Sequence, residues 1–108
     1  MDKFKISTAE ALAQLGEAQK PFIKLFAHGS LEVEVYQPDK VDLQQPHDRD
    51  EIYVVIAGMG TFYLEGERVD FKAGVFLFVP AGKVHRFENF SEDFSTWVFF
   101  YGPVGGEI

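Results

Sequence analysis

From Phe22 to Tyr101 the chain consists of short apolar runs of period two, separated by glycine, proline and other turn residues, and this pattern restricts the fold most. The segment Leu31–Tyr36 alternates apolar and acidic residues, as in a strand with one solvated face. Similar runs follow at Ile52–Ala57, Thr61–Leu64, Arg68–Phe71, Val75–Val79, Val84–Phe87 and Ser95–Tyr101. About eight short strands with turns every 8–12 residues predict an antiparallel sandwich or barrel, and they exclude a parallel α/β sheet.

The one clear helical signal precedes these strands. Ser7 or Thr8 can serve as an N-cap, and Glu10 would complete a capping box with Ser7. The residues Ala9–Leu15 favour a helix, which Gly16 is expected to end. A helix this short needs tertiary contacts, so we expect it to dock on the β-structure.

Composition and charge indicate a single domain over residues 1–108. Hydrophobic residues make up 46% of the chain, and no repeat or linker divides it. The net charge of −7 disfavours nucleic acid as a partner, and the apolar runs are too short for a membrane span. The absence of cysteine excludes disulfides, thiolate metal sites and cysteine nucleophiles. We therefore expect a soluble protein of the cytoplasm.

The aromatic residues point to an additional interface. Nine of the 12 phenylalanines lie at or beyond Phe62, which is more aromatic surface than the interior of a small barrel holds. Part of it is expected to cover a second sheet face, shielded by the N-terminal segment or by another subunit. A homodimer is therefore predicted.

Among the three histidines, His28, His47 and His85, the second has the most informative neighbours. Glu51 follows His47 by four residues, and in a straight strand their Cα atoms would be about 13 Å apart. The residues at positions 48–50 favour a turn, which would bring the two side chains together. Glu51 then heads an apolar strand, where a carboxylate is costly unless it is paired or metal-bound.

His85 directly follows a tight turn and shares a strand face with Phe87, while Tyr53 shares a face with Glu51. Two imidazoles and one carboxylate in a barrel mouth would suit a divalent transition metal. The same three residues are equally compatible with a buried hydrogen-bonded cluster without metal. Tyr53 and Phe87, the next residues along these faces, are the predicted lining of a substrate pocket.

Two spaced motifs in residues 39–89 resemble those of the cupin family. The second motif, G-x5-P-x-G-x2-H-x3-N, is complete in Gly74, Pro80, Gly82, His85 and Asn89. The first motif, G-x5-H-x-H-x3–4-E-x6-G, is matched in part, by His47, Glu51 and Gly58. Asp39 stands in place of its opening glycine and Gln45 in place of its first histidine.

This resemblance implies an all-β, antiparallel jelly-roll β-barrel with a short N-terminal helix packed outside. It also implies one divalent metal ion (Fe, Mn, Ni, Zn or Cu) at the open end, held by His47, Glu51 and His85. Gln45 is then either a weak fourth ligand or a residue that orients a metal-bound water, and we favour the second role because a neutral amide competes poorly with water.

The function implied by this likeness is that of a metal-dependent enzyme on a small organic molecule, with dioxygenase chemistry as the leading class. The alternative is a non-catalytic cupin that binds a small ligand in the same barrel. A sugar isomerase ranks third, because holding a sugar phosphate would require cations near the pocket. The parity of the strand turns Arg86 away from that pocket.

Overall fold

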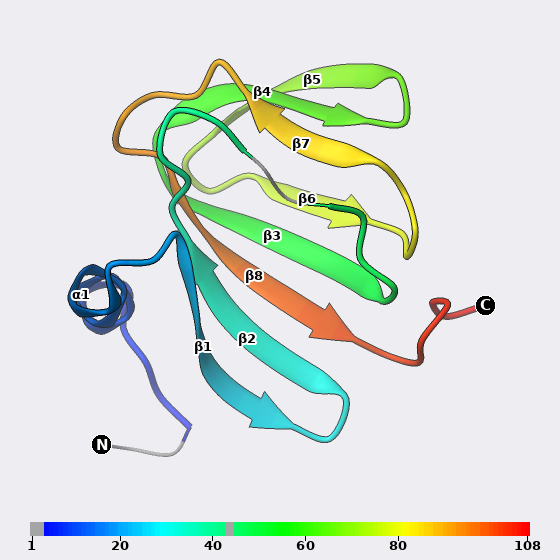
Figure 1. Ribbon diagram of the computed structural model, residues 1–108, viewed down its shortest axis with the longest axis horizontal. Helices are drawn as coiled ribbons and strands as arrows, with labels where there is room; N and C mark the ends of the chain where they lie inside the picture. Colours follow the sequence, from blue (N-terminus) through cyan, green and yellow to red (C-terminus); the bar gives the residue numbers. More distant parts are fainter. Residues whose placement is uncertain (1–3, 43–44) are drawn as a thin grey trace.

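The computed structural model describes residues 4–42 and 45–108, which form one helix and two antiparallel sheets (Figure 1). A five-stranded sheet has the order β1-β2-β8-β3-β6, and a three-stranded sheet has the order β5-β4-β7. The elements are α1 (Thr8–Ala18), β1 (Phe22–His28), β2 (Leu31–Tyr36), β3 (Asp50–Ala57), β4 (Met59–Leu64), β5 (Glu67–Lys72), β6 (Phe76–Val79), β7 (His85–Glu88) and β8 (Ser95–Tyr101).

The predicted antiparallel β-fold with a short N-terminal helix is confirmed, whereas the predicted barrel is confirmed only in part. Within the described ranges, no strand pairing joins one sheet to the other, so the sheets do not close into a barrel. The two sheets instead pack through their inner faces, as in a sandwich (Figure 1). No helix of the described chain is long and apolar enough to cross a membrane.

Aromatic rings from both sheets fill the core. Phe87 on β7 stands at its centre, with the rings of Tyr53, Phe62, Phe71 and Phe94 at centroid distances of 4.6 to 5.3 Å. Edge-on and tilted contacts at these distances are favourable for aromatic pairs. Phe87, one of the two predicted pocket residues, is therefore a core residue that holds the sheets together.

The helix covers part of the outer face of the five-stranded sheet. Ser7 caps it by accepting a hydrogen bond from the Glu10 amide (3.1 Å), as predicted. Gly16 does not end the helix, which continues to Ala18. The left-handed residue is instead Gln19 (φ 54°), whose amide donates to the Gly16 carbonyl.

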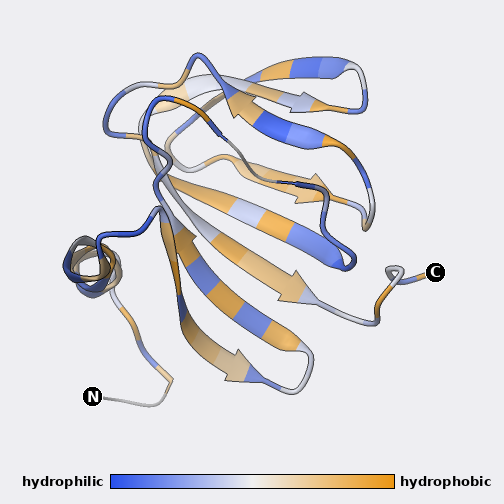
Figure 2. Ribbon diagram, viewed as in Figure 1, coloured by the Kyte–Doolittle hydropathy of each residue, from blue (hydrophilic) through white to orange (hydrophobic). Residues whose placement is uncertain are grey.

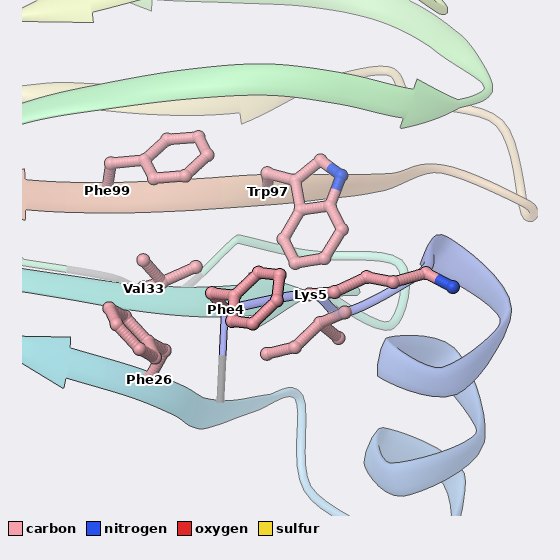
Figure 3. Close-up of a pocket in the computed structure, with 7 residues that line it drawn as sticks. Phe4, Lys5, Phe26, Val33, Trp97 and Phe99 are labelled. Atoms are coloured by element: carbon pink, nitrogen blue, oxygen red, sulfur yellow. The ribbon is translucent and has the colours of Figure 1, made fainter. Parts of the chain in front are cut away.

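The N-terminal segment extends this cover beyond the helix. Figure 3 shows Phe4 over the outer face of the sheet, near Val33 on β2 and near Trp97 and Phe99 on β8. These side chains and their neighbours enclose a shallow apolar pocket of about 260 Å³. Phe4 itself is 90% exposed, but Ile6 and the helix pack on this face, so the N-terminal segment shields part of it, one of the two predicted alternatives.

The strand β2 corrects one expectation about orientation. Figure 2 shows hydrophilic and hydrophobic residues alternating along it, as the sequence predicted. The acidic residues lie on the inner face, however, where Glu34 is half-buried and lines a pocket. The apolar residues face outward, where Val35 is buried beneath the helix.

A glycine connection joins β3 to β4. Gly58 has φ +91°, and a Cβ atom there would lie 2.6 Å from the Phe94 Cα. Gly58 is therefore required at this position, both for its conformation and for the close approach. β4 begins directly after it, at Met59, two residues earlier than the sequence predicted.

Candidate metal centre

His47, Glu51 and His85 come together between the two sheets. His47 precedes β3, Glu51 lies near the start of β3, and His85 begins β7 on the opposite sheet. The bend at residues 48–49 has the predicted effect of bringing His47 close to Glu51. One potential ligand atom from each residue lies within 4.8 Å of the others.

These separations suit a single ion. The Glu51 Oε1 atom lies 3.2 Å from His85 Nε2 and 3.9 Å from His47 Nε2. An ion with bonds of about 2.0–2.2 Å holds neighbouring ligand atoms roughly 3–4 Å apart. The residues present therefore fit a divalent metal.

Glu51 supplies an independent indication of a missing partner. Its side chain is only 1% exposed, yet its Oε1 atom makes no hydrogen bond of normal geometry. A buried carboxylate oxygen without a hydrogen bond carries a desolvation cost of about 1–3 kcal/mol or more. A cation bound between Glu51 and the two imidazoles would remove that cost.

The His85 ring is oriented by the turn before it. Its Nδ1 atom lies 2.9 Å from the Lys83 carbonyl, which can only accept, so Nδ1 carries a proton, and in the neutral ring Nε2 presents a lone pair to the cluster. Burial acts to lower the pKa of His85, but the Glu51 carboxylate and the Lys83 carbonyl outweigh it and raise the pKa. The Tyr53 hydroxyl lies 3.2 Å from Nε2, so Tyr53 borders the cluster as well.

Hydrogen bonds between loops hold the site together. The Gly82 amide donates to the His47 carbonyl (2.6 Å), which links the two motifs directly. The buried Asp50 carboxylate accepts from the Ala81 amide (3.0 Å) and from the Glu107 amide (2.8 Å). Asp50 thus fastens three segments beside the cluster. From the sequence it was placed only in the predicted turn at positions 48–50.

A pocket of about 240 Å³ adjoins the cluster on the inner face of the five-stranded sheet. His47 and Glu51 line one side of it, and the remaining lining residues are Phe22, Glu34, Tyr36, Val98 and Phe100. We call this cavity the acidic pocket. The predicted residues Tyr53 and Phe87 are almost fully buried and are not among these lining residues.

Two further residues lie near the pocket, one with a structural role that its contacts show and one with a predicted role toward the metal. Asp42, which the sequence analysis did not single out, is buried and accepts hydrogen bonds from the Tyr36 hydroxyl (2.6 Å) and the Phe87 amide (2.8 Å). It therefore fixes one wall of the acidic pocket to β7. Gln45 is exposed in the loop before His47, and its role toward a metal stays a prediction.

Comparison with known proteins identifies the family. The family model described as the cupin domain matches residues 32–101, which include all three clustered residues. The chain belongs to the cupin family. This cupin is 29% identical over 105 residues to an uncharacterised protein of Streptomyces coelicolor, an alignment that covers 95% of this chain and 98% of that protein.

Solved structures extend the comparison. The DMSP lyase DddQ from Ruegeria pomeroyi superposes with a TM-score of 0.65 and 26% identity, over 75% of this cupin and 46% of the lyase. This cupin thus spans about half of the lyase. A Streptococcus pyogenes protein of unknown function superposes with a TM-score of 0.64 over 95% of this chain and 96% of its own, and its 19% identity shows the shared fold alone.

Proposed function

We propose that this cupin binds one divalent metal ion through His47, Glu51 and His85 and is an enzyme that acts on a small organic molecule in the acidic pocket. The observation that carries the proposal is the buried Glu51 oxygen, which has no hydrogen bond and lies between two imidazole nitrogens. When bound, the ion would supply Lewis-acid or redox chemistry. Three protein ligands leave coordination positions for substrate or water.

The donor set narrows the choice of metal. Two imidazole nitrogens and one carboxylate suit Fe, Mn, Ni, Zn or Cu, whereas Mg²⁺ and Ca²⁺ prefer oxygen donors throughout. His85 is fixed by Lys83 and His47 by its ring contact with Phe100 (centroids 4.8 Å apart). Contacts within the chain thus orient both imidazoles toward Glu51.

The side chains around the cluster limit the size of the substrate and supply groups that can exchange protons with it. A cavity of about 240 Å³ limits the substrate to a small molecule. Tyr53 is buried with its hydroxyl next to the cluster, so it is placed to hold or pass a proton at its Oη atom. Glu34 lines the opposite wall of the pocket, so its carboxylate can contact the bound molecule.

Two reaction classes follow. Dioxygenase chemistry is the class implied by the likeness to small single-domain cupins. An oxygen-independent lyase is the second candidate, because structures of DMSP lyases, DddQ at 26% identity among them, resemble this cupin. A sugar-phosphate isomerase is disfavoured: Arg86 pairs with Glu88 and lies over the Tyr63 ring, and no Lys or Arg lines the acidic pocket within the described residues.

The test begins with metal analysis of protein purified without chelators or an affinity tag. We expect about one transition-metal ion per chain, and a chain that takes up none under any loading condition would contradict the proposal. Small organic acids and diketones are then incubated with the loaded protein in air and under nitrogen. Turnover that requires O2 and places both of its atoms in the products identifies a dioxygenase, and turnover in both atmospheres that eliminates part of the substrate identifies a lyase. A ligand that is bound but never converted identifies the non-catalytic alternative and overturns the enzyme proposal.

A further inference from the structure

The acidic pocket contains a carboxylate, that of Glu34, which is not one of the proposed metal ligands. Glu34 lies on β2, opposite Val98 on β8, which in turn lies opposite Tyr53 on β3. Its backbone is thus two strands away from that of Tyr53, roughly 10 Å. Glu34 therefore stands on the wall of the pocket opposite the His47–Glu51 side.

The charge on Glu34 has no close counterpart. Within the described residues its carboxylate makes no hydrogen bond and no ion pair, although Lys24 is its cross-strand neighbour. Lys24 pairs with Glu32 instead, and so does Arg49, at 2.9 Å. Both nearby cations are thus directed to Glu32. Glu34 is left half-buried and unpaired.

The surroundings of Glu34 also act on the pKa of its carboxyl group. Burial is the largest factor that raises the pKa of Glu34, and the negative charges of Glu32 and Glu51 raise it further. Lys24 opposes them, and its contribution is the smallest. Two carboxylates, Glu34 and Glu51, line the pocket, and within the described residues no Lys or Arg does, so the lining favours a cationic guest.

The other lining residues are suited to a cation with alkyl substituents. The rings of Phe22, Tyr36 and Phe100 line the same cavity. Aromatic faces attract ammonium groups within about 6 Å of the ring centroid, and methylated ammonium groups are recognised in this way. A carboxylate among aromatic rings combines charge pairing with apolar contact.

We propose that the acidic pocket selects an organic cation, whose ammonium-type group contacts Glu34 and the aromatic rings while its other end reaches the His47–Glu51–His85 cluster. The second contact rests on the proposed metal site, and the first does not. The pocket would accordingly reject anions of the same size.

The first experiment isolates the contact with Glu34. Tetramethylammonium, which has no metal-binding atom, is titrated against the protein as purified, and its binding is followed by saturation-transfer NMR with tert-butanol as the neutral probe. We expect tetramethylammonium to bind and tert-butanol to bind at least tenfold more weakly, a factor that corresponds to about 1.4 kcal/mol. Glu34→Gln should weaken tetramethylammonium binding by a similar factor.

A matched variant controls for overall charge. Glu67→Gln makes the same change on β5, in the other sheet, and should bind tetramethylammonium as the parent protein does. Equal binding to Glu34→Gln and the parent protein would overturn the proposal, and so would equal binding of the two probes. Circular dichroism and thermal melting confirm that each variant is folded.

The second experiment adds the metal-binding end. Glycine betaine carries both a trimethylammonium group and a carboxylate, and 3,3-dimethylbutanoate is its carbon counterpart without the positive charge. With Zn²⁺-loaded protein we expect betaine to bind about tenfold more tightly, and Glu34→Gln should abolish this preference. A preference that persists in Glu34→Gln would count against the proposal. If the protein binds no metal but still binds tetramethylammonium through Glu34, the metal function fails and the cation site stands.

Discussion

The two faces of the five-stranded sheet show an unusual distribution of polar residues. The inner face carries the carboxylates of Glu32 and Glu34 on β2 and of Glu51 on β3, with β8 between the two strands. Antiparallel sheets usually show the reverse, with apolar residues inside and polar residues toward solvent. The outer face carries the apolar residues Val33, Ile52, Val54, Phe76, Phe78, Trp97 and Phe99.

Neither the carboxylates on the inner face nor the apolar residues on the outer face favour the stability of an isolated chain. Buried carboxylates cost free energy, and exposed aromatic surface promotes association. Phe76 is 61% exposed and Phe78 is 41% exposed, and neither belongs to the cluster that the helix covers. The inner face is therefore suited to a ligand and the outer face to a macromolecular partner. We propose that this partner is a second copy of the chain.

The strongest test of the inner face is His85→Ala. Because the ring supplies one of three proposed ligand atoms, we expect metal affinity to fall by more than about a hundredfold. The fold should persist, since the core beneath the site is aromatic and apolar. Metal content is measured by elemental analysis, with His28→Ala, an exposed histidine on β1, as the matched control. Undiminished metal in His85→Ala would show that the ligand assignment is wrong.

The outer face is tested by introducing charge. The double variant Phe76→Glu with Phe78→Glu should weaken the proposed homodimer by at least about a hundredfold, because two buried carboxylates would face apolar surface. Sedimentation velocity should show a dimer for the parent protein and a monomer for the variant. Val104→Glu, an exposed position outside the sheet, should remain dimeric. A parent protein that is monomeric at micromolar concentration would refute the dimer.

A smaller effect is expected at the loop contacts beside the cluster. Asp50→Ala removes the acceptor of the Ala81 and Glu107 amides, so the free energy of unfolding should fall by about 2–3 kcal/mol. Urea denaturation measures this change. Asp48→Ala, two residues earlier and exposed, is the control and should stay within about 0.5 kcal/mol of the parent protein. Equal stability of the two variants would contradict the role assigned to Asp50.

The smallest effect is predicted at Gln45. If its amide orients a water and does not bind the metal, Gln45→Ala should change metal affinity by less than about twofold, whereas Gln45→His should increase it by adding an imidazole. Competition with a chromophoric chelator measures both affinities. A large loss of metal in Gln45→Ala would instead identify Gln45 as a ligand.

The sequence predicted most of the β-structure, because the alternation of apolar residues and the turn residues are local signals. The ends of β2 and β8 were predicted to the residue, at Leu31–Tyr36 and Ser95–Tyr101. Alternation does not reveal which face is buried, however. The acidic residues of β2 were therefore assigned to solvent, although Glu34 faces the pocket.

The cluster of His47, Glu51 and His85 was also predictable, from one turn and two motifs. The supporting carboxylates were not. Asp50 accepts from amides 31 and 57 residues away, and Asp42 accepts from an amide 45 residues away. Such partners are set by how the two sheets pack, and nothing in the neighbouring sequence specifies them.

The orphaned oxygen of Glu51 has a practical consequence for the whole molecule. Any ion that binds there stabilises the folded chain by an amount that grows with its affinity and concentration. The midpoint of a thermal melt therefore becomes a readout of occupancy. A panel of melts with different divalent salts would rank the metals that the protein prefers, before any substrate is known.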